Sequence, residues 1–351
     1  MQSEKYSRDN AGQSLKKYIL LKKGELAYNH GASKAKQYGC CYELTEDEAR
    51  IPYVYHCFKV SSAEHTPYVA TALNNPKIDR QLKRLVSSSV RMDGLLNISF
   101  DDYMSVILHL PSLKEQTHIA DFLKKLDERI TAQEKLVASL KKYKRGLLRK
   151  VFAKLSDSCE KRNLKEVSVL FADGDWIESK DQASDGIRLI QTGNVGFGVY
   201  IDKTQNAKYI SETTFHRLNC LEIYDGDILI SRLPEPAGRA CLLPKSTERR
   251  ITAVDCTVIR TDSSVIDRNY LLQFLCSEQY LKTVNSFLAG GTRQRISRKN
   301  LEGIEVPCPS IDEQRYWGSF LCKVDARISN EEQRRSSLSR LRCFMLQQLF
   351  I

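Results

Sequence analysis

The segments PSLKEQ (residues 111–116) and PSIDEQ (residues 309–314) are two copies of one sequence. The displacement between them, 309 − 111 = 198 residues, holds on both sides without a gap. At this displacement the matching pairs are Ile98-Ser99 with Ile296-Ser297, Leu126-Asp127 with Val324-Asp325, Ile130 with Ile328, Leu140 with Leu338, and Phe152 with Phe350. The chain is therefore a tandem repeat of one unit, and its function should depend on having two related surfaces.

A long helix is predicted to follow each copy of this segment. Residues 114–153 contain no proline and one glycine, and a seam of mainly apolar residues recurs at alternating spacings of four and three. At 1.5 Å per residue such a helix is roughly 57 Å long. Residues 317–349 repeat the pattern. We expect the two helices to pair as an antiparallel coiled coil, with Gln133 and Glu331 as polar seam residues that fix its register.

The start of each predicted helix carries an acid followed by an amide, Glu115-Gln116 and Glu313-Gln314. Such groups satisfy first-turn N–H groups and favour the helix dipole. A capping role is therefore expected for them.

The residues between the two helices have a different pattern. Short β-branched or aromatic runs at residues 188–190, 227–230, 240–243 and 257–259 alternate with Gly, Asn, Asp and Pro, which predicts strands and turns. Apolar residues at helical spacing predict one helix over residues 268–288. The repeated unit is therefore an α+β globule followed by a long helix.

Residues 1–110 match only the later part of this globule, because residues 22–28 parallel residues 223–229. Only 23 residues precede Gly24, whereas 226 − 162 = 64 residues separate Arg162 from Gly226, so we expect the first globule to lack about 40 residues at its start. The predicted organisation is a first globule that is N-terminally incomplete, a first long helix, a second globule and a second long helix, at residues 1–110, 111–155, 156–308 and 309–351. Antiparallel pairing of the helices would relate the globules by a pseudo-twofold axis.

Composition favours a polyanionic partner. The chain has 351 residues, a formal net charge of +11 and a pI near 9.0. Its eleven cysteines form no Cys-x-x-Cys pair, which is typical of reduced thiols in a cytosolic protein. The amino-terminal residues lack an apolar signal region, and no window is apolar enough to predict a membrane span, so a cytoplasmic location without membrane contact is expected.

The ordered pairs of motifs resemble the specificity subunit of type I restriction–modification systems. They are LDERI (126–130) with LLRKVF (147–152), and VDARI (324–328) with LQQLF (346–350). The resemblance implies that each globule is a target recognition domain reading one half of a split site on double-stranded DNA. It also implies that the paired helices fix the half-site spacing and dock two methyltransferase (modification) subunits, with restriction/translocase subunits joining through the complex. No catalysis by this chain is implied.

The most suggestive stretch for DNA contact in the second globule is GGTRQRISRK at residues 290–299. Its glycines let the backbone approach a groove. Base-edge contacts are expected for Arg293, Gln294 and Arg295, and phosphate contacts for Ser297, Arg298 and Lys299. The alternative is a solvated basic turn before a strand.

A second candidate is the rigid loop that Arg232 and Arg239 flank, around the sequence PEPAG. In the first globule the matching candidates are Asn29, His30, Lys34 and Lys36, together with Arg91 in the counterpart of the basic stretch. The alternative is a charged surface loop without a ligand.

Motifs of catalysis are absent from the sequence. It has no phosphate-binding GxxxxGK[ST] loop, no glycine fingerprint for a nucleotide, and no Asn/Asp-Pro-Pro-aromatic motif of amino methyltransferases. The six histidines show no metal-ligand spacing. No catalytic residue, cofactor or metal is therefore expected. Two functions remain open: a DNA-recognition subunit, or a free-standing DNA-binding regulator or coiled-coil scaffold without modification partners.

Overall fold

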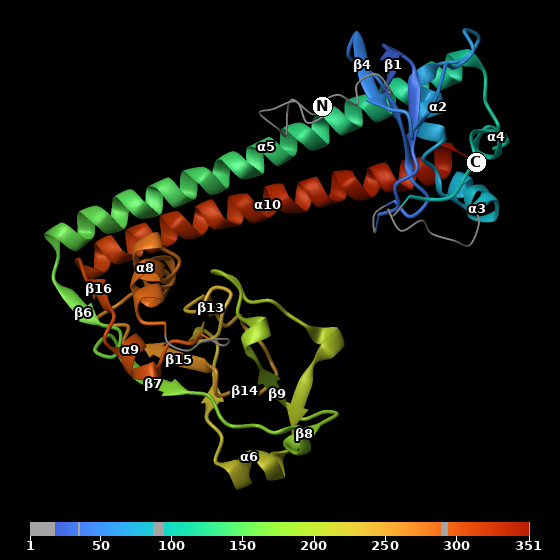
Figure 1. Ribbon diagram of the computed structural model, residues 1–351. Helices are drawn as coiled ribbons and strands as arrows, with labels where there is room; N and C mark the ends of the chain where they lie inside the picture. The colour runs from blue at the N-terminus through green and yellow to red at the C-terminus, as the bar shows by residue number, and fades with distance from the viewer. Residues whose placement is uncertain (1–17, 34–35, 87–94, 289–293, 351) are drawn as a thin grey trace. The chain divides into compact units, whose positions relative to one another are not determined.

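The computed structural model describes residues 18–33, 36–86, 95–288 and 294–350, and the chain divides into two compact units (Figure 1). Unit 1 comprises Met1–Glu134 with Gln333–Ile351, and unit 2 comprises Lys135–Glu332. Two long helices, α5 (Leu113–Ser158) and α10 (Ile311–Leu349), each contribute one part to either unit. Both units mix helices with strands, which confirms the predicted α+β content.

Within its described residues, unit 1 contains five strands and three short helices besides its parts of α5 and α10. They are β1 (Tyr18–Lys22), β2 (Leu26–Asn29), β3 (Cys40–Glu43), β4 (Glu48–Pro52), β5 (His56–Phe58), α2 (Thr66–Ala72), α3 (Pro76–Leu85) and α4 (Phe100–Met104). The strands form an antiparallel sheet in the order β3-β2-β5 and an antiparallel pair β1-β4.

The core of unit 1 joins its sheet to the helices. Tyr28 of β2 is buried with Ile78 and Leu82 of α3 and with Tyr103 of α4. A second cluster packs the start of α5 against α2 and the end of α10, with Leu123, Tyr68 and Phe350 among its members. The Tyr68 and Phe350 rings stack with centroids 5.0 Å apart. Burial of these aromatic side chains attaches the globule of unit 1 to its part of the helix pair.

Unit 2 contains eleven strands, four α-helices and three 3₁₀ turns within its described residues, besides its parts of α5 and α10. The strands are β6 (Lys161–Asn163), β7 (Ser168–Asp173), β8 (Gln182–Ala183), β9 (Ile187–Ile190), β10 (Lys208–Ile210), β11 (Glu222–Ile223), β12 (Ile228–Ser231), β13 (Ala240–Leu242), β14 (Arg250–Thr252), β15 (Cys256–Thr261) and β16 (Glu305–Pro307). The helices and turns are α6 (Glu212–Leu218), α7 (Arg268–Leu275), α8 (Glu278–Ser286), α9 (Arg298–Glu302), η2 (Ser179–Asp181), η3 (Thr192–Asn194) and η4 (Thr204–Asn206).

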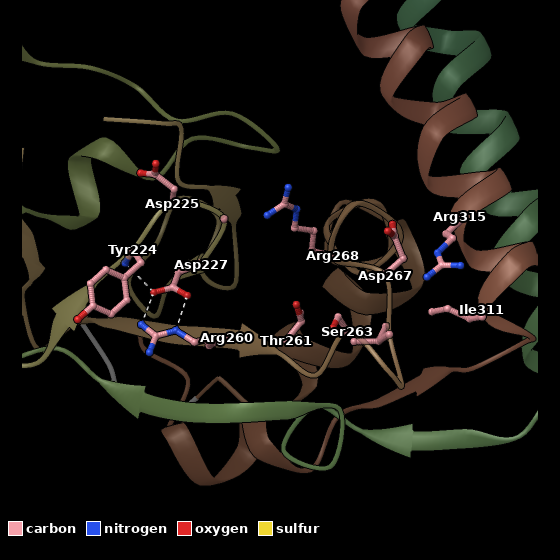
Figure 2. A pocket seen from close by; sticks show the side chains of 12 residues that line it. Tyr224, Asp225, Asp227, Arg260, Thr261, Ser263, Asp267, Arg268, Ile311 and Arg315 are labelled. Carbon is pink, nitrogen blue, oxygen red and sulfur yellow. Dashed lines mark hydrogen bonds and ion pairs between the residues drawn. The ribbon is translucent and has the colours of Figure 1, made fainter. Parts of the chain in front are cut away.

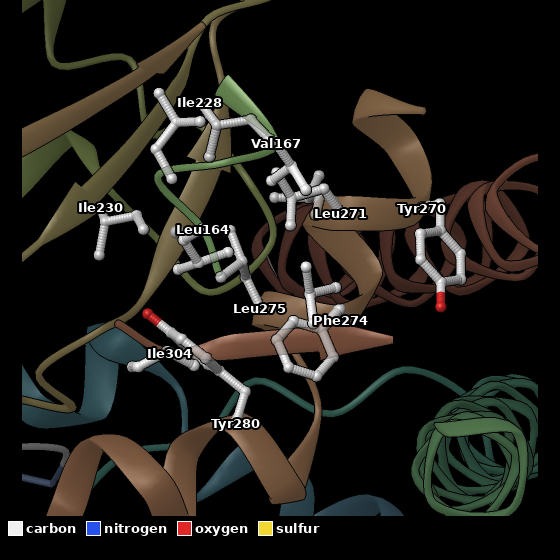
Figure 3. Close-up of a cluster of buried hydrophobic side chains, with 14 of the residues drawn as sticks. Leu164, Val167, Ile228, Ile230, Tyr270, Leu271, Phe274, Leu275, Tyr280 and Ile304 are labelled. Carbon is white, nitrogen blue, oxygen red and sulfur yellow. The ribbon is translucent and has the colours of Figure 1, made fainter. Parts of the chain in front are cut away.

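The strands of unit 2 form two main sheets, in the orders β13-β12-β15-β7 and β11-β14-β9-β10-β8. The first is antiparallel, and the second contains one parallel pair, β14 with β9. The four runs predicted as strands lie in or overlap β9, β12, β13 and β15, so these predictions are confirmed. Figure 3 shows the main core, where Ile228 and Ile230 face Leu271, Phe274 and the ring of Tyr280.

The prediction of a single helix over residues 268–288 is wrong. Helix α7 ends at Leu275 and α8 begins at Glu278, with Cys276 and Ser277 between them. The buried Ser277 side chain accepts a hydrogen bond from the Tyr280 backbone N–H at 3.2 Å. Ser277 is therefore the N-cap of a new helix. Unit 1 has the same division into α2 and α3, with Asn75 as the cap that accepts from Lys77 N–H at 2.8 Å.

Comparison of the two units shows which strands the repeat shares. The order β13-β12-β15 in unit 2 corresponds to β3-β2-β5 in unit 1, and the pair β11-β14 corresponds to β1-β4. In unit 2, β15 also pairs with β7 and β14 also pairs with β9. Within the ranges that the structure describes, unit 1 has no strand beside β5 or β4 at those two places.

The predicted capping role is wrong for the amides that begin the long helices. Gln314 is buried, accepts a hydrogen bond from Asp267 N–H at 2.9 Å and donates to Val265 O at 3.1 Å. Gln116 is equally buried and accepts from His65 N–H at 2.9 Å. In the first helix Ser112 Oγ accepts from Glu115 N–H at 3.4 Å and Glu115 Oε2 accepts from Ser112 N–H at 3.1 Å. The serine and the acid therefore form a capping box, and the predicted capping role is confirmed for Glu115. Each glutamine instead fastens its long helix to the start of α2 or α7.

Neither α5 nor α10, nor any shorter helix in the described ranges, has the length and apolar character needed to cross a membrane.

Candidate nucleic-acid interface

Two stretches predicted to bind DNA meet at one end of the sheet β13-β12-β15-β7 in unit 2. The loop that follows β12 begins at Arg232, whose carbonyl accepts a hydrogen bond from Ile296 N–H at 3.2 Å. Arg295 Nη1 lies 3.7 Å from Asp255 Oδ1, just before β15. The basic segment before α9 and the loop after β12 are therefore adjacent parts of one surface.

The basic segment presents exposed polar and charged side chains at this surface. Those in the described part of the chain are Gln294, Arg295, Ser297, Arg298 and Lys299. The Ser297 hydroxyl is partly committed, because it accepts from Asn300 N–H at 3.1 Å and caps α9. Arg298 Nε lies 3.2 Å from Glu302 Oε1, an exposed pair of small energetic value. Gly290, Gly291, Thr292 and Arg293 lie outside the described residues.

Arg232 is buried, with only 3% of its surface exposed. Its Nη2 donates to Val254 O at 2.6 Å and lies 3.4 Å from Asp173 Oδ2. A guanidinium group held in this way cannot reach a ligand at the surface. The geometry therefore does not support the prediction that Arg232 contacts DNA, because the side chain joins the loop after β12 to β7 and to the residues before β15.

Arg239, at the other end of this loop, also bonds within the protein. Its guanidinium donates to four backbone carbonyls, those of Thr192, Val195, Leu233 and Pro236, at 2.7 to 3.1 Å. Burial lowers the pKa of this guanidinium from its ordinary value, since desolvation disfavours the charged form. Arg239 therefore ties the loop after β12 to the segment after β9, and direct base contact by its side chain is not supported either.

His30 in unit 1 occupies the place that Arg232 has in unit 2. The carbonyl of His30 accepts from Leu96 N–H at 2.8 Å, as that of Arg232 does from Ile296. Its ring Nε2 bonds to Val54 O, and its Nδ1 lies 2.9 Å from Leu96 O. His30 is only 5% exposed, so the prediction that it contacts DNA is likewise not supported.

The remaining candidates in unit 1 are at the end of β2 and in the loop that follows. Asn29 Oδ1 accepts from Gly31 N–H at 2.9 Å, and Lys36 Nζ donates to Asn74 O at 3.3 Å. Both side chains are partly exposed, so each keeps donors or acceptors for a ligand. Lys34 and Arg91 lie outside the described residues.

Sequence reasoning missed a group of exposed apolar side chains in unit 2. Trp176 is 70% exposed, and Asp175 beside it forms a β-bridge with Ala253. Phe197 and Val199 are 48% and 58% exposed on the segment that Arg239 anchors. The sequence Gly-Phe-Gly at residues 196–198 predicts a turn, but the exposure of the phenylalanine depends on tertiary packing.

A polar pocket of about 490 Å³ lies elsewhere in unit 2, beside the starts of α7 and α10 (Figure 2). Its carboxylates are already paired within the protein. Asp227 accepts from Arg260 Nε at 2.9 Å, Asp225 bonds to Arg250, and Asp267 caps α7. The carboxylates in this pocket therefore have structural partners, and the described residues contain no group of His, Cys, Asp and Glu arranged to hold a metal ion.

Comparison with known proteins identifies the family. The profile of the type I restriction modification DNA specificity domain matches residues 156–340, more than half of the chain. The chain therefore belongs to the type I restriction–modification DNA specificity family.

Two curated relatives from Methanocaldococcus jannaschii have the same classification. The type I restriction enzyme MjaVIII specificity subunit is 23% identical over 273 residues, which are 73% of this chain and 64% of the relative. The putative type I restriction enzyme MjaX specificity subunit is 23% identical over 250 residues, 66% of this chain and 55% of the relative. The chain thus spans less than two thirds of the length of each of these relatives.

Solved structures show a shared fold at low identity. The HsdS subunit from Thermoanaerobacter tengcongensis matches with a TM-score of 0.50 and 16% identity over 94% of this chain and 81% of that one. The S subunit of a type I restriction–modification system from M. genitalium matches with a TM-score of 0.54 and 17% identity over 96% and 85% of the two chains.

Proposed function

We propose that this chain is the DNA-recognition subunit of a type I restriction–modification complex. Each unit reads one half of a bipartite site on double-stranded DNA, and the chain itself catalyses no reaction. The observation that carries the proposal is the duplication, at a constant displacement of 309 − 111 = 198 residues, in a member of a DNA specificity family. Two related but different surfaces suit two different half-sites.

In unit 2, the exposed basic segment before α9 supplies the DNA contacts. Gln294 and Arg295 contact base edges, with Arg293 as a further candidate, and Ser297, Arg298 and Lys299 contact phosphates. In unit 1, Asn29, Lys36, Lys34 and Arg91 take these roles. The net charge of +11 supports the phosphate contacts, since neutralising phosphates releases condensed counterions.

The long helices act as the spacer between the half-sites. α5 has 46 residues and is therefore roughly 69 Å long at 1.5 Å per residue. In the proposal α5 and α10 pair as one antiparallel coiled coil, related by a pseudo-twofold axis, between globules at residues 1–110 and 156–308. Buried Gln133 and Glu331 on the two helices support a specified register. Such a spacer holds the half-sites more than one helical turn of DNA, about 34 to 36 Å, apart.

Two methyltransferase subunits dock on the long helices, and restriction/translocase subunits join through that complex in the cytoplasm. The repeat supports two equivalent docking sites, because Phe122 and Phe320 occupy matching positions on α5 and α10. Phe122 is 44% exposed and Phe320 is partly exposed. Exposed apolar side chains at matching helix positions suit equal contacts with two copies of one partner.

Co-expression with candidate modification subunits tests this proposal. A stable complex that binds one bipartite duplex more tightly than random duplex at physiological salt is the expected result. A monodisperse chain with no affinity for a modification subunit would favour a free-standing regulator or scaffold instead. A chain that binds neither a subunit nor specific DNA contradicts the proposal outright.

A further inference from the structure

Three alternate side chains of unit 2, Phe197, Val199 and Ile201, form an exposed apolar tip. They are 48%, 58% and 43% exposed. The residue between the last two, Tyr200, is partly buried and packs against the cluster of Ile190 and Leu229. The backbone here is a tight turn, since Val195 and Tyr200 form an antiparallel β-bridge and residues 197–199 are the bends between them, with the exposed side chains on its outer face. Here the outer face is apolar, where a solvated face would carry polar residues.

The backbone of the apolar tip is fixed by hydrogen bonds. Gly196 N–H donates to Val199 O at 2.9 Å, and Ile201 N–H donates to Asn194 O at 2.8 Å. The Asn194 side chain returns a bond to Ile201 O at 2.9 Å. The apolar side chains are therefore presented on an ordered backbone, which keeps the conformational cost of binding low.

Close packing at Gly198 also fixes the position of the apolar tip. Gly198 has a φ of +74°, in the left-handed region that favours glycine, and an added Cβ would lie 3.0 Å from Cys276 Sγ. Its N–H donates to Ala240 O at 2.8 Å. The two contacts place Gly198 inward, so Phe197 and Val199 on either side are held at the surface.

The apolar tip is continuous with the candidate DNA interface. Arg239 donates both to Val195 O, one residue before the tip, and to Leu233 O in the loop after β12. That loop is joined to the basic segment by the bond between Ile296 N–H and Arg232 O. Hydrogen bonds thus connect the apolar tip, the loop after β12 and the basic segment.

A pocket of about 170 Å³ lies beside the apolar tip. Its lining is rich in amides and cations and includes Gln191, Asn194, Lys203, Asn206 and Lys208. No acidic residue is among the side chains that line it. Asp202 lies nearby, but its carboxylate is 3.3 Å from Arg188 Nη2. Positive charge and amide groups next to an ordered apolar surface are complementary to duplex DNA. Its major groove exposes thymine methyl groups and is bordered by anionic phosphates.

We propose that the apolar tip contacts thymine C5-methyl groups in the DNA major groove, while Lys203 and Lys208 bind flanking phosphates. This inference rests on the proposed function and extends it. It assigns sequence discrimination in unit 2 to apolar contacts as well as to the arginine and amide donors. Each such contact buries a methyl group, worth about a fourfold change in affinity.

The test first identifies the DNA motif that the complex methylates. It then measures binding of the full chain to a duplex carrying that motif and to duplexes in which single thymines are replaced by uracil, which removes the C5-methyl group. The unmodified protein should lose about fourfold in affinity at one or two positions of the unit 2 half-site. V199T keeps the side-chain shape and replaces one of the two methyl groups by a hydroxyl, so it should reduce that sensitivity. F197A gives a second, independent variant. The matched control is V169T, at a valine on β7 that is 66% exposed.

Salt dependence separates the two kinds of contact. K203A should reduce the slope of log affinity against log salt by about one, whereas V199T should leave it unchanged. Uracil sensitivity that V199T and F197A both retain would overturn the inference and leave the proposed function standing. If these variants no longer bind a modification subunit but keep their sensitivity to uracil, the apolar tip contacts a protein and the inference is overturned. Absence of specific DNA binding by the unmodified chain would contradict both.

Discussion

Lys144 Nζ of α5 lies 2.5 Å from Asp325 Oδ1 of α10, and the same two repeat positions form an ion pair in unit 1 with the helices exchanged. There Arg342 of α10 binds Asp127 of α5, with Nη2 and Oδ2 3.0 Å apart. Asp127 and Asp325 differ by 198 positions, as do Lys144 and Arg342. Each unit thus joins its two helix parts through one acid and one base in equivalent positions.

Removal of this pair in unit 2 should be measurable, because the Lys144 side chain is only 14% exposed. K144A should lower the free energy of unfolding by about 1 kcal/mol. The carboxylate of Asp325 keeps a bond from Gln273 Nε2 at 2.9 Å, which limits the loss. Chemical denaturation of the full chain measures the change.

The matched control for K144A is K142A, an exposed lysine two residues earlier on α5. It should leave stability within about 0.5 kcal/mol of the unmodified chain. A double-mutant cycle with D325N isolates the interaction itself. Equal effects of K144A and K142A, or a coupling near zero, would show that the pair contributes no stability.

The stability of unit 2 should depend strongly on Gln314, which joins the start of α10 to the start of α7. Q314A removes a buried side chain that accepts from Asp267 N–H and donates to two carbonyls, so the expected loss is about 3 kcal/mol. The exposed neighbour Glu313 provides the control, since E313A should cost about 0.5 kcal/mol at the helix start. Thermal or chemical unfolding measures both variants. Equal losses of unfolding free energy would show that Gln314 does no more than cap the helix.

Arg232 should matter for stability more than for DNA contact. R232A leaves Asp173 without its cation and Val254 O without its donor, so unfolding should become easier by about 3 kcal/mol. R298A, at an exposed arginine on the same surface, should leave stability nearly unchanged and reduce the salt slope of DNA binding. A stable R232A protein with a lower salt slope would instead indicate a phosphate contact by Arg232.

His56 should make unit 1 sensitive to acid. Burial is the main cause that lowers the pKa of this imidazole below its ordinary value, with the ring of His30 5.0 Å away as a further cause. The folded state therefore takes up the proton less readily than the unfolded state. The contribution to stability is complete above the ordinary pKa, near 6.5, and is lost as pH falls toward the lower folded value.

The measurement is unfolding free energy against pH for the unmodified chain and H56F, which keeps a ring against Phe100 and Tyr103. Between about pH 7 and 5.5, H56F should lose less stability than the unmodified chain. H118F, at an exposed histidine on α5, should keep the original pH dependence. Identical curves for all three proteins would contradict this account of His56.

Cysteine reactivity should follow burial. All eleven cysteines are free, and burial raises the pKa of Cys241 and of Cys276 to about 12. Cys343 on α10 is exposed. Because the thiolate is the reactive form, iodoacetamide at pH 8 should label Cys343 well before the two buried thiols, as read by peptide mass spectrometry. Early labelling of Cys276 in the native chain would show that the packing around Gly198 opens readily.

The long helices and the repeat could be predicted because their information is local and periodic. Residues 114–153 specify a helix by spacing alone, and α5 extends that prediction by one residue at its start and five at its end. The break between α7 and α8 could not be predicted in this way, because helical spacing of apolar residues continues across Cys276 and Ser277. Only the N-cap geometry of Ser277 reveals it.

The candidate site shows the same limit more strongly. Arg232 and Arg295 have the same side chain, yet one is buried against Asp173 and the other is exposed. Asp173 is 59 residues from Arg232 in sequence (232 − 173), so the sequence gives no sign that the two meet. The apolar tip was missed for a related reason: the partial burial of Tyr200 and the exposure of Val199 depend on the cluster behind them.

The central claim, that two units read two half-sites, is tested most directly by the methylated motif. The measurement is single-molecule sequencing of host DNA from cells that express this chain with its modification subunits, compared with cells that lack the chain. The account predicts one motif made of two defined segments separated by a fixed number of unspecified bases. A single contiguous motif, or no methylation although the complex forms, would contradict it.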